Sequence, residues 1–594
     1  MVLSPLTIVI LLFASSIIAY ILGKISGKAA GIFSTLVSLV SLVMVIFLLF
    51  LGGEMFSFSY NGLIVNSLTV FIAFIPAFLG FLSLLYSISY VKDNFAWYYA
   101  FTLLFIGSMI GLAFSWNLLW MYILLELTTI TSAILVAHKR DEKSFEAALK
   151  YAFQCFFAGF LALIGIVLLY TQTGTLSILE LQPLTNPATL LSTILIMVGF
   201  GIKIPYAFLH AWLPDAHAEA PAPISCLLSG AMIKVGATTT FLPLFKLLQL
   251  TSFSGFNTVL CWLGVITMIV GAFMALIQSD IKRLLAYCSI SQMGYVTVGL
   301  SLGTPLGIVA GLFHALNHAI AKGLLFLGAG AVEHETGTRN MDRLGGLAKN
   351  MPLTAATMII ASLGLAGIPL LNGFNSKWMI YEACIEAGQP LIAMVGMFVS
   401  ALTLLYLLKM VHSVFFSLKA SENIKNVRDP SILMVAPLLL LSALCVLFGI
   451  VPQLPIQLIL VDATKALNPT PPSLNLFPII TEVGVWGPTY ATLLMIIGLI
   501  VGFLLYRFSV KPAKKIEISD KFLPFTGGLA KPPYVGMDEA KVPSKPFSFA
   551  ADPICNVFKR FHTGMLNHYF TWIVLFLIIF LIIFYLLFTF SGGC

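Results

Sequence analysis

The chain has 594 residues, of which 59% are hydrophobic and only 9% are charged. Soluble domains carry roughly 25% charged residues, so this composition excludes an ordinary globular protein, a disordered chain and a collagen-like repeat. Apolar runs of about 20 residues match a hydrocarbon core roughly 30 Å thick and predict an all-α polytopic membrane protein. In such a protein a net charge of +8 need not indicate nucleic acid, because cationic excess reports loop topology.

Taken in chain order, the apolar runs predict about 16 transmembrane helices. The first run has no basic n-region and no clear cleavage site, so we expect a retained span rather than a signal peptide. The twelfth run is too long for one straight helix and contains Gly367, Pro369, Asn372 and Gly373, which predict a break. The expected spans are 3–22, 30–52, 63–88, 98–114, 117–137, 150–170, 190–212, 224–246, 258–277, 284–302, 307–330, 353–388, 391–416, 431–451, 489–507 and 567–589.

The basic residues predict the orientation of these spans. They gather in the odd-numbered loops, and Lys465 is the plain exception in an even-numbered one. By the positive-inside rule the odd loops are cytoplasmic and the N-terminus is outside, which suits a multi-pass protein of the cell membrane. The odd-loop residues are Lys24, Lys28, Lys92, Lys139, Arg140, Lys143, Lys282, Arg283, Arg339, Arg343, Lys349, Lys419, Lys425 and Arg428.

Residues 511–565 differ in composition from everything before them, being charged and rich in proline. Their prolines exclude one continuous helix, and the count of spans places the segment on the cytoplasmic side. Within it, residues 553–564 could form a short helix with an apolar face, or a plain linker to the last span.

Several ionisable residues lie inside the expected spans, where each is a functional candidate because a buried charge is costly. A lysine near a helix end can instead extend to the interface, which is the favoured account for Lys246 and Lys409 but a poor one for Lys234. His314, His318 and Lys322 recur at i, i+4 and i+8 and share one helical face, which favours a proton relay over packing. The candidates are Glu126, Lys203, Lys234, His314, His318, Lys322 and Lys377.

These residues could move protons without a metal or another cofactor. Burial disfavours the charged form of a lysine, whereas a nearby carboxylate such as Glu126 favours it. Moving the carboxylate away would therefore release a proton.

Two histidine-containing groups raise the question of a metal site. The HxxxH pair at 314 and 318 lacks the glutamate of a zincin site, and its helical face continues with a lysine, so a metal is disfavoured there. His210, Asp215, His217 and Glu219 lie among prolines, and we interpret them as a cytoplasmic mouth that feeds protons inward. The eight cysteines include no CxxC pair, which argues against iron–sulfur or zinc ligation and against a disulfide framework.

Glycine, proline and lysine recur together in spans seven and twelve, as GFGIKIP at 199–205 and as GLAGIP at 364–369 followed by GFNSK. Broken helices at corresponding places are typical of inverted-repeat transporters, with the ion path at the breaks. The implied units are spans four to eight and spans nine to thirteen, inserted with opposite orientation.

Four stretches resemble the antiporter-like subunits of respiratory complex I, of multisubunit Na⁺/H⁺ antiporters and of energy-converting membrane-bound hydrogenases and related sulfur-reducing complexes. The resemblance covers roughly residues 60–420. It implies fourteen core helices, two inverted five-helix repeats, and a proton half-channel in each repeat, joined by a polar axis at the membrane midplane. The stretches are HAWLPDAHAEAPAPISCLLSGAMIKVG, QSDIKRLLAYCSISQMGY, FHALNHAIAKGLLFLGAGAV and LAGIPLLNGFNSKW.

Carried over by motif, Glu126 would pair with Lys203, and Lys234 would be the central lysine. The pair of histidines with Lys322 would carry the axis, and Lys377 would handle protons at its end. The organisation implied is N-terminal helices over 1–97, repeats over 98–246 and 258–416, C-terminal core helices over 431–507, a lateral segment over 511–565 and an anchor helix over 567–589.

The resemblance leaves the branch of the family open. Lys234 together with Ser376, Lys377 and Trp378 is closer to the hydrogenase and antiporter D-type members, and prolines interrupt the region where the respiratory L subunit has a long lateral helix. We expect a proton-translocating subunit of a redox-driven complex, with membrane partners, peripheral redox subunits and no redox site or cofactor of its own. Any iron–sulfur or nickel–iron centres would lie in partner subunits. The alternatives are a Na⁺/H⁺ antiporter subunit without redox chemistry, and a structural membrane anchor.

Overall fold

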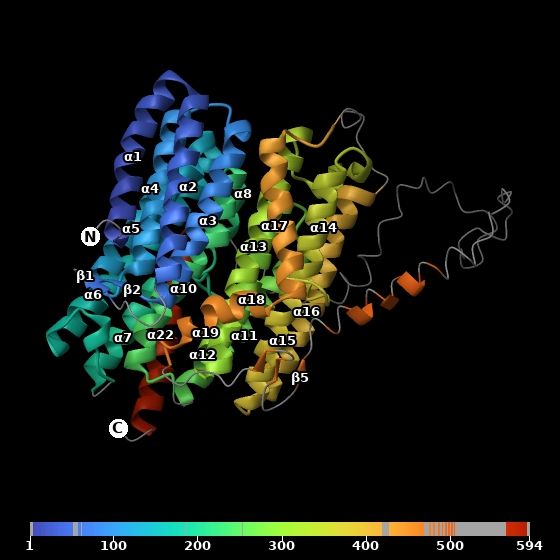
Figure 1. Cartoon of the computed structure of the whole chain (residues 1–594). Helices are drawn as coiled ribbons and strands as arrows, with labels where there is room; N and C mark the ends of the chain where they lie inside the picture. Colours follow the sequence, from blue (N-terminus) through green and yellow to red (C-terminus); the bar gives the residue numbers. More distant parts are fainter. Residues whose placement is uncertain are drawn as a thin grey trace.

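The computed structural model shows a bundle of upright helices, with the N-terminal half beside the C-terminal half (Figure 1). Among the described residues, 12 helices are long and apolar enough to cross a membrane. Their outward faces carry exposed apolar side chains such as Ile25 and Phe50, as expected of surfaces that meet lipid. The structure describes residues 4–51, 58–60, 62–183, 186–251, 254–417, 427–468 and 566–590, and isolated residues between 475 and 504.

The first two helices form the outer edge of the N-terminal half, whereas the third is mostly buried. The Ser4 hydroxyl accepts the Thr7 N–H and caps the first of them, and Asn66 and Thr69 form a capping box on the third. A small hairpin precedes the third helix, with Phe58 opposite Val65. The elements are α1 (Pro5–Ile25), α2 (Gly27–Leu51), β1 (Phe58–Tyr60), β2 (Leu63–Val65) and α3 (Ser67–Tyr90).

The next elements form the first expected repeat, and its seventh span is interrupted. α7 ends at Gly201, and the chain forms turns until α8 begins at Trp212. The following span contains a π-helical turn, η3, which ends two residues before Lys234. The elements are α4 (Phe95–Phe114), α5 (Leu118–Val136), η1 (Ala137–Lys139), α6 (Glu142–Thr173), η2 (Ile178–Glu180), α7 (Pro187–Gly201), α8 (Trp212–Glu219), α9 (Ala222–Leu227), η3 (Leu228–Met232) and α10 (Ile233–Leu247).

The second expected repeat contains the break predicted in span twelve. α14 ends at Ala366, Gly367 adopts a φ of +85°, and α15 begins at Asn372. Such a φ suits glycine, which ends the first half of the span with little strain. The elements are α11 (Gly255–Leu276), α12 (Ile281–Ser301), α13 (Pro305–Thr336), η4 (Met341–Arg343), η5 (Leu347–Lys349), α14 (Pro352–Ala366), α15 (Asn372–Glu386), α16 (Pro390–Val411) and η6 (His412–Phe416).

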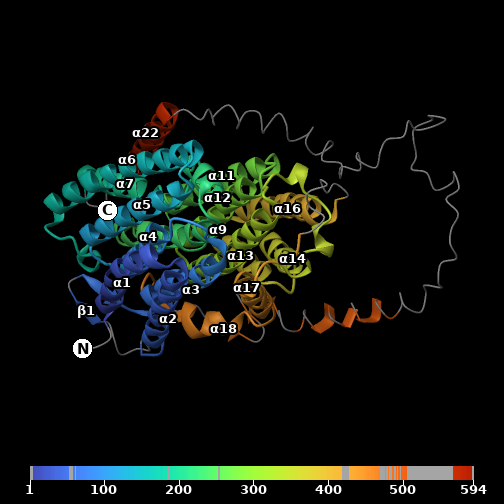
Figure 2. The ribbon, with the colours of Figure 1, turned by 90° about the horizontal axis from the view of Figure 1, so that it is seen from above.

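The last described helix returns to the middle of the chain. α22 packs against α6, α7 and α11, on the side of the bundle away from α17 (Figure 2). Phe570 contacts Phe157 of α6, and Phe584 contacts Phe256 of α11. The elements are α17 (Ile432–Ile450), α18 (Gln453–Pro455), η8 (Ile456–Leu460), α19 (Val461–Thr464), β3 (Asn475–Leu476), β4 (Ile479–Ile480), β5 (Val485–Trp486) and α22 (Leu566–Phe590).

The all-α fold and the break in span twelve are confirmed, whereas the number of 16 spans and the division into repeats stay predictions. Two helices extend beyond the expected spans. α6 starts at Glu142 rather than at 150, because Asp141 caps a charged first turn, and α13 continues to Thr336 rather than ending at 330. The lateral segment over 511–565 and the helix expected at 553–564 lie outside the described residues.

α13 is the centre of the molecule. Its apolar window is 100% buried, and it contacts α12, α14, α15 and α17 as well as α3 and α9. The ionisable residues of α13 are therefore shielded from water on every side of the helix.

Candidate functional site

Lys203 lies in the interruption between α7 and α8 and is fully buried. Its Nζ donates a hydrogen bond to the Tyr151 hydroxyl of α6 at 2.8 Å and lies 4.7 Å from the centre of that ring. The expected ion pair between Lys203 and Glu126 is not formed here. The Glu126 Oε2 has no hydrogen-bond partner within the described part of the chain.

Lys234 is the second residue of α10, the helix that follows the π-helical turn. A π-turn shifts the backbone hydrogen bonds by one residue, and such turns are frequent at functional sites. The Lys234 ammonium donates to the backbone carbonyl of Ser229, within that turn. The Ser229 hydroxyl lies 2.7 Å from that of Ser289 on α12, so this turn contacts the second half of the protein.

The polar face predicted for α13 is present, and all three of its side chains are buried. His314 is hydrogen-bonded on both ring nitrogens, to the Ser376 hydroxyl at 3.0 Å and to Gln292 Oε1 at 3.2 Å. The ring of His318 stacks beside that of His314 with centroids 6.4 Å apart, and its nitrogens have no hydrogen-bond partner among the described residues. Lys322 donates to the Leu285 carbonyl at 2.9 Å.

Lys377 lies in the first turns of α15, after the break. Its Nζ donates to the Leu365 carbonyl at 2.8 Å and to the Ser400 hydroxyl at 3.0 Å, and it lies 4.8 Å from the centre of the Tyr295 ring. Leu365 is in the last turn of α14, where carbonyls have no partner inside the helix. The break in the span thus supplies the acceptor that holds Lys377.

The residues expected to form a cytoplasmic mouth lie in and beside α8, but they do not form one cluster. Asp215 pairs with Arg283 at 2.8 Å, whereas Glu219 pairs with Arg339 at 2.6 Å. His217 is buried and stacks on Phe326, 4.8 Å between ring centroids. Lys322 lies 5.9 Å from the same Phe326 ring, so one aromatic side chain separates His217 from the axis. His210 is buried, with its ring centroid 6.4 Å from that of Tyr287.

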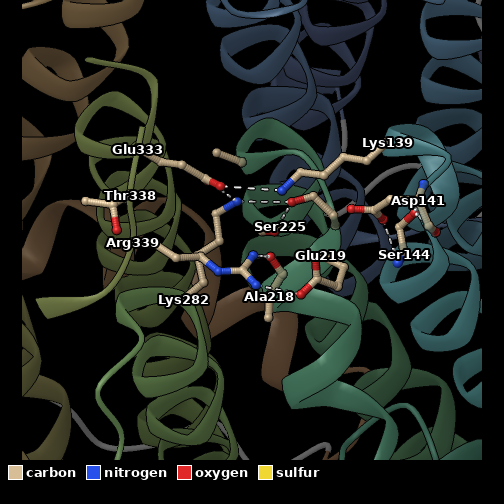
Figure 3. A network of polar contacts seen from close by, with 12 residues as sticks. Lys139, Asp141, Ser144, Ala218, Glu219, Ser225, Lys282, Glu333, Thr338 and Arg339 are labelled. Carbon is tan, nitrogen blue, oxygen red and sulfur yellow. Dashed lines mark hydrogen bonds and ion pairs between the residues drawn. The ribbon is translucent and has the colours of Figure 1, made fainter. Parts of the chain in front are cut away.

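Around the end of α8, charged groups from both halves of the chain form a network (Figure 3). Lys282 of α12 is fully buried, and its Nζ lies 2.6 Å from Glu333 Oε2 on α13. Lys139 lies 3.4 Å from the other oxygen of that carboxylate. Lys139, Lys282 and Arg339 come from three odd-numbered loops, and their meeting places those loops on one face of the bundle.

Arg339 forms the second part of this network. Its guanidinium lies 2.6 Å from Glu219 and 2.5 Å from Asp280, and it also donates to the Ala218 carbonyl. Burial lowers the pKa of Arg339, but these carboxylates raise it more, so the net shift is upward and the group stays charged. The network therefore ties the end of α8 to the start of α12.

Sequence reasoning missed the groups that hold the candidate residues. Tyr151, Gln292 and Ser400 carry no motif, because a lone tyrosine, amide or hydroxyl in an apolar run is typical of packing. Glu382, by contrast, is a buried acidic residue inside the predicted twelfth span, and the rule that singled out Glu126 applies to it equally.

Comparison with known proteins assigns the chain to a family. The sequence profile described as "NADH:quinone oxidoreductase/Mrp antiporter, TM" matches residues 115–403, which hold all the buried lysines described above. NADH-quinone oxidoreductase subunit N of Desulforudis audaxviator is 33% identical over 368 residues, which cover 59% of this chain and 72% of that protein. The chain belongs to this family, as its resemblance predicts. It is an antiporter-like membrane subunit of the complex I, Mrp and hydrogenase type.

Two further proteins are similar over longer stretches. Hydrogenase-4 component B of Escherichia coli is 33% identical over 430 residues, or 66% of this chain and 63% of that protein. A chain in the structure of the membrane-bound sulfane sulfur reductase, an archaeal respiratory membrane complex, is 26% identical with a TM-score of 0.78. That likeness covers 96% of this chain and 99% of the other.

Proposed function

We propose that this protein translocates protons as a membrane subunit of a redox-driven complex, of the membrane-bound hydrogenase or sulfur-reducing type. The observation that carries the proposal is the kind of partner its buried lysines have. Within the described residues, Lys203, Lys234, Lys322 and Lys377 each donate to an uncharged oxygen, and none of them forms an ion pair.

Lys282 shows what a structural buried lysine looks like in the same protein. It is equally buried, but its Nζ forms an ion pair with the Glu333 carboxylate. An ammonium held only by neutral oxygens in a low-dielectric interior can lose its proton without leaving an unpaired carboxylate. The four neutral-partnered lysines are therefore suited to take up and release protons in turn.

The remaining candidates supply the connections. His314 and His318 bridge α13 between Lys322 and Lys377, and Glu126 offers Lys203 a carboxylate partner. His210, Asp215, His217 and Glu219 would feed protons from the cytoplasmic side, with the N-terminus outside and the chain in the cell membrane. The similarity to the sulfane sulfur reductase chain, over nearly the whole length of both, supports the redox-driven type.

We expect the chain to assemble with other membrane subunits and, through them, with peripheral redox subunits that hold the iron–sulfur or nickel–iron centres. Purification of the tagged protein with its natural partners tests this. Recovery of peripheral subunits with such centres supports the proposal. Recovery of small membrane subunits alone overturns the redox part in favour of a Na⁺/H⁺ antiporter.

Proton transport is tested on the assembled complex in sealed vesicles with a pH-sensitive dye. Lys203→Ala and Lys377→Ala are expected to lower proton uptake per turnover at least about tenfold while the subunits still copurify. Lys246→Ala removes an exposed lysine of α10 and is the matched control. Full uptake by both buried-lysine variants in intact complexes would show that the chain is a structural anchor.

A further inference from the structure

Lys203 rests on two aromatic rings that fix its position. Besides the Tyr151 ring, its Nζ lies 5.9 Å from the centre of the Trp212 ring, and the centroids of these two rings are 4.8 Å apart. The Trp212 indole donates to the Ile202 carbonyl at 3.1 Å, beside Lys203 in the chain. The interruption of span seven thus places the lysine on an aromatic seat made of Tyr151 and Trp212.

The Tyr151 hydroxyl is itself held by neighbours on two other elements. It lies 2.7 Å from the Ser132 hydroxyl of α5 and 3.5 Å from the Met232 sulfur, in the π-helical turn that precedes Lys234. Tyr151 is fully buried. These contacts orient the hydroxyl, which lies between Lys203 and the π-helical turn that holds Lys234.

The Glu126 carboxylate occupies a different place along the same helix. A Cβ added to Gly159 of α6 would lie 1.8 Å from Glu126 Oε1, so the absence of a side chain there makes room for the carboxylate. Tyr151 and Gly159 are eight residues apart on one helical face, which corresponds to about 12 Å of rise. Lys203 and Glu126 are thus docked at two separate positions on α6.

We propose that Tyr151 is a positioning residue that holds Lys203 away from Glu126 during proton transfer. Lys203 alternates between the carboxylate, where the ammonium is retained, and the aromatic seat, where its proton passes on toward Lys234. This inference rests on the proposed proton transport and assigns a role in it to a residue that no sequence motif marks. Each transfer breaks one N–H or O–H bond and forms another, and it needs no oxidant, reductant or leaving group.

The test is Tyr151→Phe in the assembled complex, which keeps the ring and removes only the hydroxyl. Lys203 is then expected to remain with Glu126, so proton uptake falls about tenfold and its optimum moves to higher pH, because a carboxylate partner retains the proton. Tyr98→Phe is the matched control: Tyr98 is also buried and its hydroxyl lies 2.7 Å from that of Ser87. The control variant is expected to stay within about twofold of wild type with an unchanged pH profile.

A double variant separates positioning from a purely structural role. If Tyr151 competes with Glu126 for the lysine, Tyr151→Phe has no further effect on uptake or on the pH optimum once Glu126 is changed to Gln. Additive effects, or a Tyr151→Phe variant with the wild-type pH profile, overturn the inference. Lys203→Ala keeps the two proposals apart. Normal uptake in that variant refutes proton transport through Lys203 itself, whereas lost uptake beside a normal Tyr151→Phe variant refutes only the role of Tyr151.

Discussion

Lys282 and Glu333 form a buried ion pair between α12 and α13, with 2.6 Å between Nζ and Oε2. The Lys282 side chain is 0% exposed and that of Glu333 is 19% exposed. Lys282 also donates to the Ala220 carbonyl at 3.2 Å, so it contacts the segment that follows α8. Because removal of one partner leaves an uncompensated buried charge, the pair stabilises the contact between α12 and α13 and, through Lys282, their contact with the segment after α8.

We predict that Glu333→Gln lowers the free energy of unfolding by about 3 kcal/mol, since Lys282 is left buried without its carboxylate. Thermal unfolding in detergent measures the change. Combining Glu333→Gln with Lys282→Met removes the charge as well and is expected to recover most of the loss. Glu335→Gln alters a neighbouring carboxylate that is more exposed and should cost less than about 1 kcal/mol. Equal effects of the two single variants would contradict this account.

Substitution of the two α13 histidines is predicted to lower proton uptake in both cases but to destabilise the protein only at His314. His314→Phe leaves Gln292 and Ser376 without the ring nitrogens they face, which costs about 1–3 kcal/mol for a buried unsatisfied group. His318→Phe breaks no hydrogen bond to a described residue and should unfold close to wild type. Proton uptake is expected to fall in both, because each removes a titratable group from the face. A stable, fully active His318→Phe variant would remove His318 from the proton path.

Gly373 is predicted to be essential for the broken twelfth span. A Cβ at this position would lie 2.0 Å from the Gly364 carbonyl oxygen, and a backbone atom cannot move aside as a side chain does. Gly373→Ala is therefore expected to push α15 away from α14, at a cost of about 1–3 kcal/mol or more, and to displace Lys377. Gly498→Ala is the control, because no described residue lies within 4 Å of its added Cβ. Unfolding temperature and proton uptake are compared for the two variants.

Asp141 is predicted to give the start of α6 a pH-dependent stability. The Ser144 backbone N–H donates to the Asp141 carboxylate at 2.8 Å, and hydrogen bonding with Ser144 lowers the pKa of Asp141. A lowered pKa in the folded protein stabilises it above the pKa of the unfolded chain, about 3.9, and this stabilisation is lost as the pH falls through the folded value. Asp141→Ala should cost about 1 kcal/mol at pH 7.

Asp141→Asn is the matched variant for that measurement. Asparagine caps a helix about as well as aspartate, so the variant should resemble wild type at pH 7 and lack its extra loss of stability between about pH 5 and 3. An identical pH dependence in the two proteins would assign the effect to other carboxylates.

The sequence predicts well the features that depend on composition. Charged residues inside apolar runs are costly, so Lys203, Lys234 and Lys377 could be identified by position alone, and all three are buried. Glycine with proline marks the break at Gly367 because few other residues tolerate that backbone conformation. The partners of these lysines were not predictable, since Tyr151 and the Leu365 carbonyl differ in no local pattern from the rest of the core. The sequence identifies Arg339 only as a basic loop residue, and its contact with Glu219 follows from the fold.

α22 lies near the C-terminus and packs back against helices from the middle of the chain. It packs against α6 and α7 on one side and α11 on the other, and Gly255 at the start of α11 leaves room for Leu587, whose Cδ2 a Cβ there would meet at 2.7 Å. The helix thus fastens the two halves together along their outer seam (Figure 2). Any relative rotation of those halves must displace α22 from α6 and α7 on one side or from α11 on the other. α22 is thereby a brace that limits how far the two halves can move relative to each other.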